Sequence, residues 1–370
     1  MKTGTGDKNQ VSPKTCLPLI FFLLILTFVL LPATGCRGQK AEEKAKKPPG
    51  EEVGSGQGFT VGVLVAFDSP TSEEVLKSFR STLEKYQQAS GQKVELRIEK
   101  ARGELALLPE LARKLAANCQ VLVPISTPAL QAVMIATEKI PIVFSSVANP
   151  YILRAGRTAV DHDPRITGVC STAPVKQVLG LIKEVKPGEK KIGTIWTPSE
   201  INSQYYLELM SEAAEELGLE LVSTPIDEAA DLVSAFQYLM QQQAKVICPV
   251  SDNTINANFD QLARLAEENR VPLFAAFALG AELGACASMG FGFADIGKKT
   301  AELVIRVKNG ESPALIPFQY MDKVLFYINE EASRKQGLSW PPQILKRADV
   351  ILKTTNKDGG GINFRAGSIG

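Results

Sequence analysis

A single histidine is the first shortage in this chain of 370 residues. Mechanisms that need a histidine base, a Ser-His-Asp relay or a metal site with several histidines have only His162 to use. Lys and Arg number 41 against 40 Asp and Glu, so the chain also lacks the basic surplus with which proteins neutralise nucleic-acid phosphates. These shortages argue against most hydrolase mechanisms and against a nucleic-acid partner.

Motifs of nucleotide-binding and hydrolytic sites are missing as well. The first predicted strand is not followed by GxGxxG, and the chain contains no GxxxxGK[ST], GxSxG or HExxH. The sequence DHDP, 161–164, is typical of an exposed turn and would make a poor metal site. We therefore expect no enzyme activity, no cofactor and no metal. An enzyme on a doubly wound scaffold stays an alternative, because fold alone does not exclude catalysis.

The N-terminal residues have the pattern of a targeting segment. Basic residues precede an apolar run, 17–31, whose 15 residues fall short of the roughly 20 that a spanning helix needs. Small residues then lead to Cys36, which resembles a bacterial lipobox, although Ala33 stands where leucine is usual. We predict a lipoprotein signal peptide over 1–35 and lipidation of Cys36. A plain cleaved signal with an incidental cysteine is the alternative.

Two further segments are too polar to fold. Residues 36–58 are rich in Lys, Glu, Gly and Pro and have few large apolar side chains, which predicts a lipid-anchored flexible linker. The tail, 353–370, contains three consecutive glycines among polar residues and is predicted to be disordered. An anchor followed by a linker would hold the folded part outside the cytoplasm, close to the membrane.

Four cysteines fall in the part expected to fold, and none of them forms a CxxC pair. Three lie in the apolar sequences GVC, VICPV and GACAS, where a cysteine behaves as a small buried hydrophobic residue. We expect free core thiols rather than disulfides at Cys119, Cys170, Cys248 and Cys286.

From Phe59 onward, short β-branched runs alternate with stretches of helical period. The same order occurs twice, and Gly62 to Pro124 spans 62 positions while Gly193 to Pro249 spans 56. Such a duplication predicts an α/β fold made of two similar doubly wound parallel-sheet lobes. The predicted strands are 61–67, 94–98, 121–126 and 140–147 in the first copy, and 191–196, 219–223, 245–250 and 271–277 in the second.

Small polar and aromatic residues follow these strands. Parallel sheets bind ligands beyond the carboxyl ends of their strands, so two facing lobes would share one cleft. We expect the ligand to contact residues of both lobes: Phe67, Asp68, Ser69, Ser126, Thr127, Ser146, Asn149, Trp196, Ser199, Asn202, Ser203, Asp252, Asn253 and Phe277.

The chemistry of these residues suits an α-amino acid. Hydroxyl groups and backbone N–H groups at helix starts attract a carboxylate. A buried Asp252 needs a cation or several donors, and a ligand ammonium would serve as that cation. Simpler roles stay open: Asp252 as a helix cap, Thr71 and Thr197 as caps, and the aromatic residues as core.

Residues 59–350 resemble the ABC transporter substrate-binding proteins of the uncharacterised or tryptophan-binding type. The resemblance is carried by STPALQAV with IPIVFSSVANP, by ITGV with APVKQ, and by TPSEINS, VSDNT and NEEASRKQGLSWPPQILKRADVIL. It implies a type I periplasmic-binding-protein-like fold with a three-crossover hinge near Thr167, Phe291 and Pro317. The first lobe would comprise 59–167 plus 292–316, and the second 168–291 plus 317–352.

The resemblance also implies a function. The chain would bind a small solute and deliver it to an ABC permease and its ATPase, with ligand contacts at Thr127, Asn149, Ser199, Asn202, Asp252 and Asn253. The family often has Asp at Asn149, Asn at Thr197, and Ser-Asp at Cys170 and Ser171, so a ligand other than tryptophan is compatible with the sequence. A sensor of the same fold that signals to a membrane receptor or kinase is the alternative.

Overall fold

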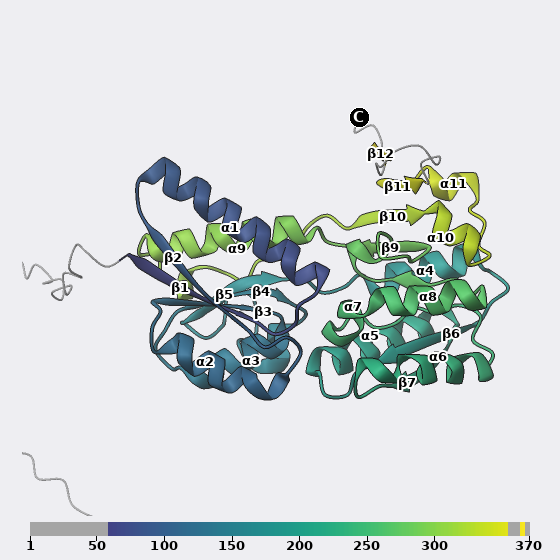
Figure 1. Cartoon of the computed structure of the whole chain (residues 1–370), viewed down its shortest axis with the longest axis horizontal. Helices are drawn as coiled ribbons and strands as arrows, with labels where there is room; N and C mark the ends of the chain where they lie inside the picture. Colours follow the sequence, from purple (N-terminus) through teal and green to yellow (C-terminus); the bar gives the residue numbers. More distant parts are fainter. Residues whose placement is uncertain (1–57, 354–362, 367–370) are drawn as a thin grey trace, which may run out of the picture. The chain divides into compact units, whose positions relative to one another are not determined.

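The first lobe is built on a five-stranded sheet in which every neighbouring pair of strands is parallel (Figure 1). The computed structural model describes residues 58–353 and the strand at 363–366. The strand order is β2-β1-β3-β4-β5, comprising β1 (Phe59–Val65), β2 (Val94–Lys100), β3 (Val121–Ile125), β4 (Ile142–Val147) and β5 (Ile166–Cys170). Val, Ile and Leu fill these strands because helices cover both faces of the sheet.

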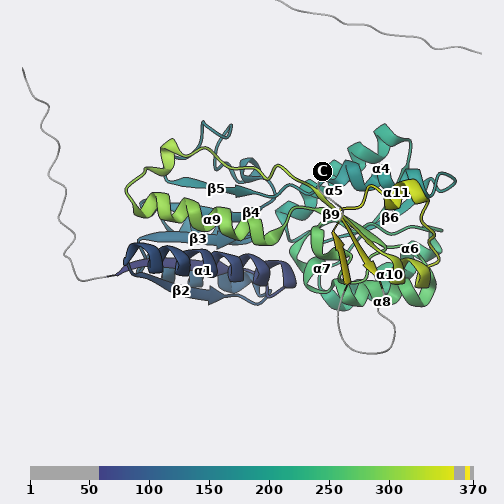
Figure 2. The same ribbon diagram turned by 90° about the horizontal axis from the view of Figure 1, so that it is seen from above.

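Two pairs of helices cover this sheet. Helices α1 (Pro70–Ser90) and α9 (Phe293–Lys308) lie side by side over one face, and α2 (Leu108–Ala116) and α3 (Thr127–Ala136) cover the other (Figures 1 and 2). Gly297 of α9 permits the first pair to pack closely, since a Cβ atom there would lie only 2.2 Å from the carbonyl oxygen of Val75 in α1. Short 3₁₀ turns at Leu105–Leu107, Pro150–Leu153 and Pro313–Leu315 complete this lobe.

The second lobe contains a mixed sheet. Single bridges from Gly193 to Ile247 and from Ile247 to Leu273 connect the parallel pair β7-β6 to the run β8-β9-β10-β11-β12. The predicted strand at 245–250 therefore lies in the sheet, where Val246, Cys248 and Val250 also share backbone hydrogen bonds with β6. The strands are β6 (Lys191–Trp196), β7 (Glu220–Pro225), β8 (Phe274–Ala275), β9 (Ala287–Gly290), β10 (Leu325–Asn329), β11 (Val350–Lys353) and β12 (Asn363–Ala366).

The helices of the second lobe surround one continuous apolar core. Helix α4 packs against α5, and α6 packs against α8. These elements are α4 (Val175–Val185), α5 (Ile201–Leu217), α6 (Leu232–Gln241), α7 (Asn253–Ala257), α8 (Phe259–Asn269), α10 (Glu330–Lys335) and α11 (Pro342–Leu345), with 3₁₀ turns at Ala229–Asp231 and Ala278–Gly280.

Three connections join the lobes, and every described residue belongs to one compact unit, Ser55–Gly370. The first runs through 171–174, because β5 keeps its pairing with β4 as far as Cys170 rather than ending near Thr167. The second runs through 291–292 and the third through 316–324. Strand β9 leads out of the second lobe and β10 leads back into it, so these neighbours run antiparallel and the sheet is not wholly parallel.

The structure confirms the predicted α/β class with two similar lobes and a three-crossover hinge. It also confirms the free core thiols, since Cys119, Cys170, Cys248 and Cys286 are all buried and unbridged. The tail predicted as disordered differs at Asn363–Ala366, which forms β12 and pairs with β11. The residue limits of the lobes stay a prediction.

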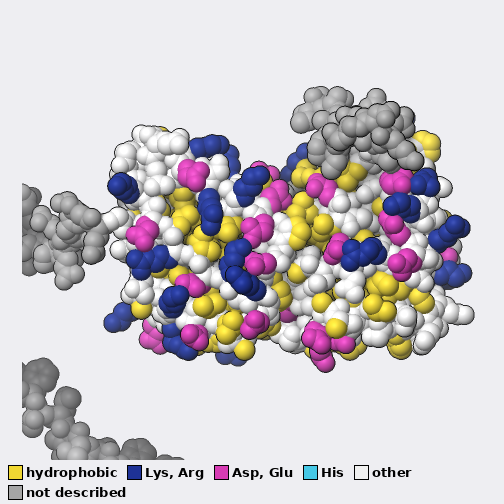
Figure 3. Space-filling model, viewed as in Figure 1, with side chains coloured by type: hydrophobic (Ala, Val, Ile, Leu, Met, Phe, Trp, Pro, Cys, Tyr) yellow, Lys and Arg dark blue, Asp and Glu magenta, His cyan; other side chains and the backbone are white. Residues whose placement is uncertain are grey.

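The predicted signal peptide, the linker and Cys36 lie outside the described residues. Among the helices that are described, none combines the length and the apolar character needed to cross a membrane. Basic and acidic side chains are interspersed on the face shown in Figure 3, in keeping with the nearly balanced charge of the sequence.

Candidate functional site

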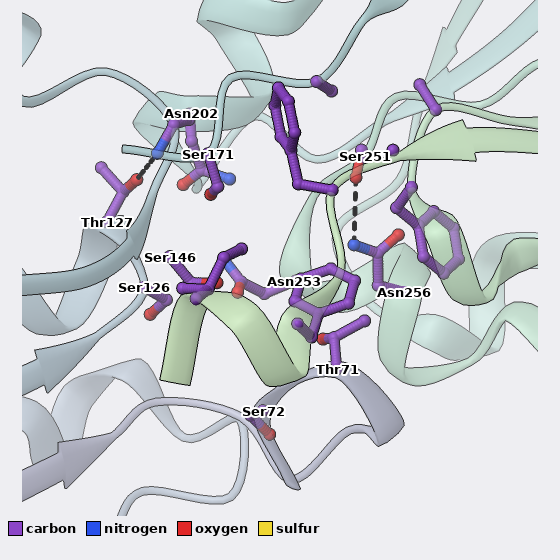
Figure 4. A pocket seen from close by; sticks show the side chains of 18 of the residues that line it. Thr71, Ser72, Ser126, Thr127, Ser146, Ser171, Asn202, Ser251, Asn253 and Asn256 are labelled. Carbon is purple, nitrogen blue, oxygen red and sulfur yellow. Dashed lines mark hydrogen bonds between the residues drawn. The ribbon is translucent and has the colours of Figure 1, made fainter. Parts of the chain in front are cut away.

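A pocket lies where the two lobes meet (Figure 4). Together with its open mouth, it encloses about 690 Å³ that protein atoms do not occupy. None of the described residues that line it carries a charge. The lining comprises Phe67, Thr71, Ser72, Ile125, Ser126, Thr127, Ser146, Ala148, Phe293 and Ile296 of the first lobe; Asn202, Tyr206, Ser251, Asn253, Asn256, Ala276, Phe277 and Gly290 of the second; and Ser171, Ala173, Pro174 and Phe291 of the connections.

Four buried polar atoms in this lining have no hydrogen-bond partner within the described part of the chain. They are the hydroxyl oxygens of Ser126 and Ser146 and the amide oxygens Oδ1 of Asn202 and Asn256. Buried polar groups in native proteins are nearly always hydrogen-bonded, because leaving one unpaired costs about 1 to 3 kcal/mol. The pocket is therefore prepared for a ligand that has polar groups of its own.

The two serines lie on the first-lobe side of the pocket, and both have an unusual backbone. Ser126 immediately precedes α3 and has φ of 97°, and Ser146 in β4 has φ of 54°. Positive φ values are uncommon for residues other than glycine, and such strain concentrates at functional sites. Ser126 makes no capping hydrogen bond to α3, so its hydroxyl remains available in the pocket beside the helix start.

On the second-lobe side, a buried carboxylate behind the wall holds two asparagines. Glu200 Oε2 accepts a hydrogen bond from Asn202 Nδ2 at 3.2 Å and from Asn253 Nδ2 at 2.5 Å. Asn256 is held separately, since its Nδ2 donates to Ser251 Oγ at 3.2 Å (Figure 4). In Asn202 and Asn256 the amide nitrogen is bound by the protein and the oxygen is left without a partner.

Asp252 lies behind the same wall and does not line the pocket. Its Oδ1 accepts from the backbone N–H of Ile255 at 2.8 Å, which caps α7. Its Oδ2 accepts from Ser203 Oγ at 2.7 Å and from the backbone N–H of Thr197 at 3.1 Å. Burial and the neighbouring Glu200 carboxylate raise the pKa of Asp252 to about 8. Asp252 therefore caps α7, which is the simpler of the two roles that the sequence left open.

Aromatic rings supply much of the apolar lining. Phe67, Phe277, Phe291, Phe293 and Tyr206 contribute from both lobes and from the second connection. The hydroxyl of Tyr206 accepts from the backbone N–H of Ala173 at 3.1 Å and donates to the carbonyl of Ser171 at 3.2 Å, which fastens the first connection to α5. Rings at these positions offer flat apolar surface to a ligand side chain.

The comparisons with known proteins agree with a two-lobed binding site. The family model for the ABC transporter substrate binding protein matches residues 60–352. This chain belongs to that family. Described residues of this substrate-binding protein contain no group of three or more side chains that could hold a metal ion.

Individual relatives of this substrate-binding protein match over most of their length. A tyrosine-binding protein of Clostridioides difficile strain R20291 is 26% identical over 302 residues, which cover 80% of this chain and 86% of the relative. A conserved domain protein of Vibrio cholerae has a structure with 30% identity and a TM-score of 0.76, covering 80% of this chain and all of the other. A Streptococcus pneumonia ABC domain in complex with L-Trp has 23% identity and a TM-score of 0.75, covering 80% and 100%, and shows the shared fold.

Half of the residues predicted for the site line the pocket of this family member. These seven are Phe67, Ser126, Thr127, Ser146, Asn202, Asn253 and Phe277. The structure does not bring the other seven into the pocket. Ser203 binds Asp252, while Ser199 is exposed and Trp196 packs on the core of the second lobe.

The remaining three predicted residues have local roles in the first lobe. Asp68 forms an ion pair with Lys100 at 2.9 Å, Ser69 caps α1 in place of Thr71, and Asn149 caps the turn at Pro150–Leu153. Ser69 and Asn149 turn back to the chain segment that follows each of them, and Asp68 turns to the end of the neighbouring strand β2. The position of a strand end does not determine these directions.

Several lining residues were not predicted from the sequence. Asn256 lies one helical turn after Asp252, and Ser171 and Phe291 lie at or next to predicted crossovers between the lobes. For these three residues, a predicted feature close by in the sequence could have indicated a place in the pocket. Other polar and aromatic lining residues that were not predicted are Thr71, Ser72, Tyr206, Ser251 and Phe293. Tyr206 is one of the buried residues of α5, and its polar end gave no sequence signal.

Proposed function

We propose that this protein captures an amino acid, preferably an aromatic one, in the pocket between its lobes and delivers it to an ABC permease and its ATPase. The observation that carries the proposal is the set of four unpartnered buried polar atoms, which face one uncharged pocket from both lobes. The zwitterion of an amino acid carries an ammonium donor and a carboxylate acceptor close together. Uncharged hydroxyl and amide groups on the two sides of the pocket can each bind one of these charged groups.

The two sides of the pocket differ in chemistry, which gives an amino acid one preferred orientation. Serine hydroxyls and the start of α3 suit a carboxylate, because O–H and N–H groups donate and the helix N-terminus carries partial positive charge. The amide oxygens of Asn202 and Asn256 suit an ammonium group, because they accept. The carboxylate would therefore lie against the first lobe and the ammonium group against the second.

An aromatic side chain is supported by the rings that line the pocket and by the relatives. Phenylalanine and tyrosine rings favour offset or edge contacts with a ligand ring, worth about 0.5 to 1.5 kcal/mol beyond burial. The curated relative is named a tyrosine-binding protein, and the Streptococcus pneumonia structure contains L-Trp. A ligand that touches both lobes stabilises the closed arrangement, which is how such a hinge would respond to solute.

The proposed place of action is outside the cytoplasm, with the chain anchored in the membrane by lipid at Cys36. The support is the sequence pattern of 1–58 and the membership of a transporter family whose members collect solute for a permease. Growth with a labelled fatty acid would test the anchor: the wild-type chain should take up label and a Cys36→Ala variant should not. Equal labelling of the two would refute it.

Binding is tested on protein purified without residues 1–36. Ligand that co-purifies is identified by mass spectrometry, and the twenty amino acids are then titrated by calorimetry into protein that has been unfolded, dialysed and refolded. We expect an aromatic amino acid to bind and to be recovered intact, whereas steady consumption would indicate an enzyme. Uptake of that amino acid should fall when the gene is deleted; unchanged uptake with altered signalling would favour a sensor.

A further inference from the structure

Glu200 is a buried carboxylate that none of the assigned roles explains. Its exposed fraction is 0%, and it stands at the residue before α5. Its two oxygens accept five hydrogen bonds from three residues. Oε2 accepts from Asn202 Nδ2 at 3.2 Å, from the backbone N–H of Asn253 at 3.1 Å and from Asn253 Nδ2 at 2.5 Å. Oε1 accepts from the backbone N–H of Thr254 at 2.9 Å and from Thr254 Oγ1 at 2.8 Å. One carboxylate thus joins the starts of α5 and α7.

These bonds fix which end of each amide faces the pocket. An ionised carboxylate only accepts hydrogen bonds, so an asparagine beside it must turn its NH₂ group toward it. The amide oxygen is then directed to the other side, and in Asn202 that oxygen is buried, unpartnered and part of a pocket-lining residue. Without the carboxylate, the NH₂ group would be equally free to face the pocket and would repel an ammonium group.

The buried charge of Glu200 also favours a cationic group in the pocket. Glu200 has no basic side chain within ion-pair distance in the described part of the chain, so only hydrogen-bond donors compensate its carboxylate. Buried negative charge without a cation is costly, and an incoming cation offsets that cost. Asn202 and Asn253, which Glu200 binds, line the uncharged pocket, and a small cation in that pocket would lie one amide group away from the carboxylate.

We propose that Glu200 is the positioning residue that makes the pocket select an α-ammonium group, by turning the oxygens of Asn202 and Asn253 toward the ligand. The inference rests on the proposed amino-acid ligand and names the part of the site that recognises its amino group. Glu200 does not touch the ligand; it acts through the two amides.

The test compares Glu200→Gln with the wild type on matched ligand pairs. L-tyrosine and L-tryptophan are titrated by calorimetry beside 3-(4-hydroxyphenyl)propionate and indole-3-propionate, which lack only the amino group. We expect the variant to bind the better amino acid about 10- to 100-fold more weakly, the range for losing a hydrogen bond to a charged group. Affinity for the matching des-amino acid should change less than about threefold, because that ligand makes no ammonium contact.

Two controls separate positioning from general damage. Glu208→Gln removes one negative charge from an exposed position of the same helix and should leave both affinities unchanged. Asn202→Ala removes the amide through which Glu200 acts, so Glu200→Gln in that background should lose clearly less than the product of the two single effects. If Glu200→Gln does not fold, Glu200→Asp takes its place, since its shorter carboxylate cannot reach both helix starts.

The outcomes are distinguishable. An equal loss of affinity for the amino acid and its des-amino analogue, or fully additive effects with Asn202→Ala, would make Glu200 a purely structural residue and overturn the inference alone. If the wild-type protein binds none of the twenty amino acids, the proposed function fails and the inference fails with it.

Discussion

Substituting Gly297 by alanine is the sharpest test of how the pocket is held together. The added Cβ atom would lie 2.2 Å from the carbonyl oxygen of Val75 and 3.1 Å from the backbone nitrogen of Phe79, both in α1. Backbone atoms cannot rotate away as a side chain can, so α9 must move from α1 by about 1 Å to restore a normal contact. Such overpacking costs about 1 to 3 kcal/mol, more than alanine gains over glycine in a helix.

Gly180 in α4 provides a matched control for the same substitution. A Cβ atom there would have no atom within 4 Å, so Gly180→Ala adds only the helix preference of alanine, about 0.5 to 1 kcal/mol of stabilisation. Guanidinium unfolding followed by circular dichroism should therefore place the two variants on opposite sides of the wild type. Ligand affinity should fall only in Gly297→Ala, because the starts of α1 and α9 line the pocket. Two variants of equal stability would refute the close packing of α1 and α9.

Three further predictions use contacts around the pocket. Tyr206→Phe leaves the buried N–H of Ala173 unpaired, so the free energy of unfolding should fall by about 1 to 3 kcal/mol in denaturant titrations; no change would contradict the described bonds. Ser126→Ala should weaken ligand binding by about 0.5 to 1.5 kcal/mol in calorimetry with unaltered thermal stability, and equal affinity would remove that hydroxyl from the site. Because burial and Glu200 raise the pKa of Asp252 to about 8, the native state keeps a proton that the unfolded chain releases above about pH 4, and stability falls as pH rises through that window. Asp252→Asn should flatten this fall between pH 5 and 8, and parallel pH profiles would count against the raised pKa.

The fold could be predicted from the sequence largely because burial leaves a periodic pattern. Both copies of the strand and helix pattern produce sheets, since alternating and continuous apolar runs report which faces are covered. Which strands pair with one another depends on residues far apart in the sequence, and this leaves no periodic pattern in the sequence of either strand. The segment 245–250 has the composition of a strand, and it joins the sheet through the bridges at Ile247 and a few backbone hydrogen bonds to β6 rather than through a regular ladder. The antiparallel β10 likewise follows from the path of the hinge rather than from its own residues.

The site was predictable where geometry follows from a strand end alone. Ser126 and Thr127 come directly after β3 and reach the pocket, whereas Asp68 and Ser199 occupy comparable places and turn away. Glu200 could not be recognised, because an acid near a helix start is usually an exposed cap. Its burial depends on donors from Asn253 and Thr254, more than fifty positions later, which only the folded chain brings together.

Residues of the hinge and of the ligand site overlap in this protein. Ser171, Ala173 and Pro174 of the first connection and Phe291 of the second are parts of the pocket wall. A solute in this pocket would contact segments that also connect the two lobes. Under the proposed function, a mutation in these shared residues is expected to change both the range of accepted solutes and the motion of the hinge.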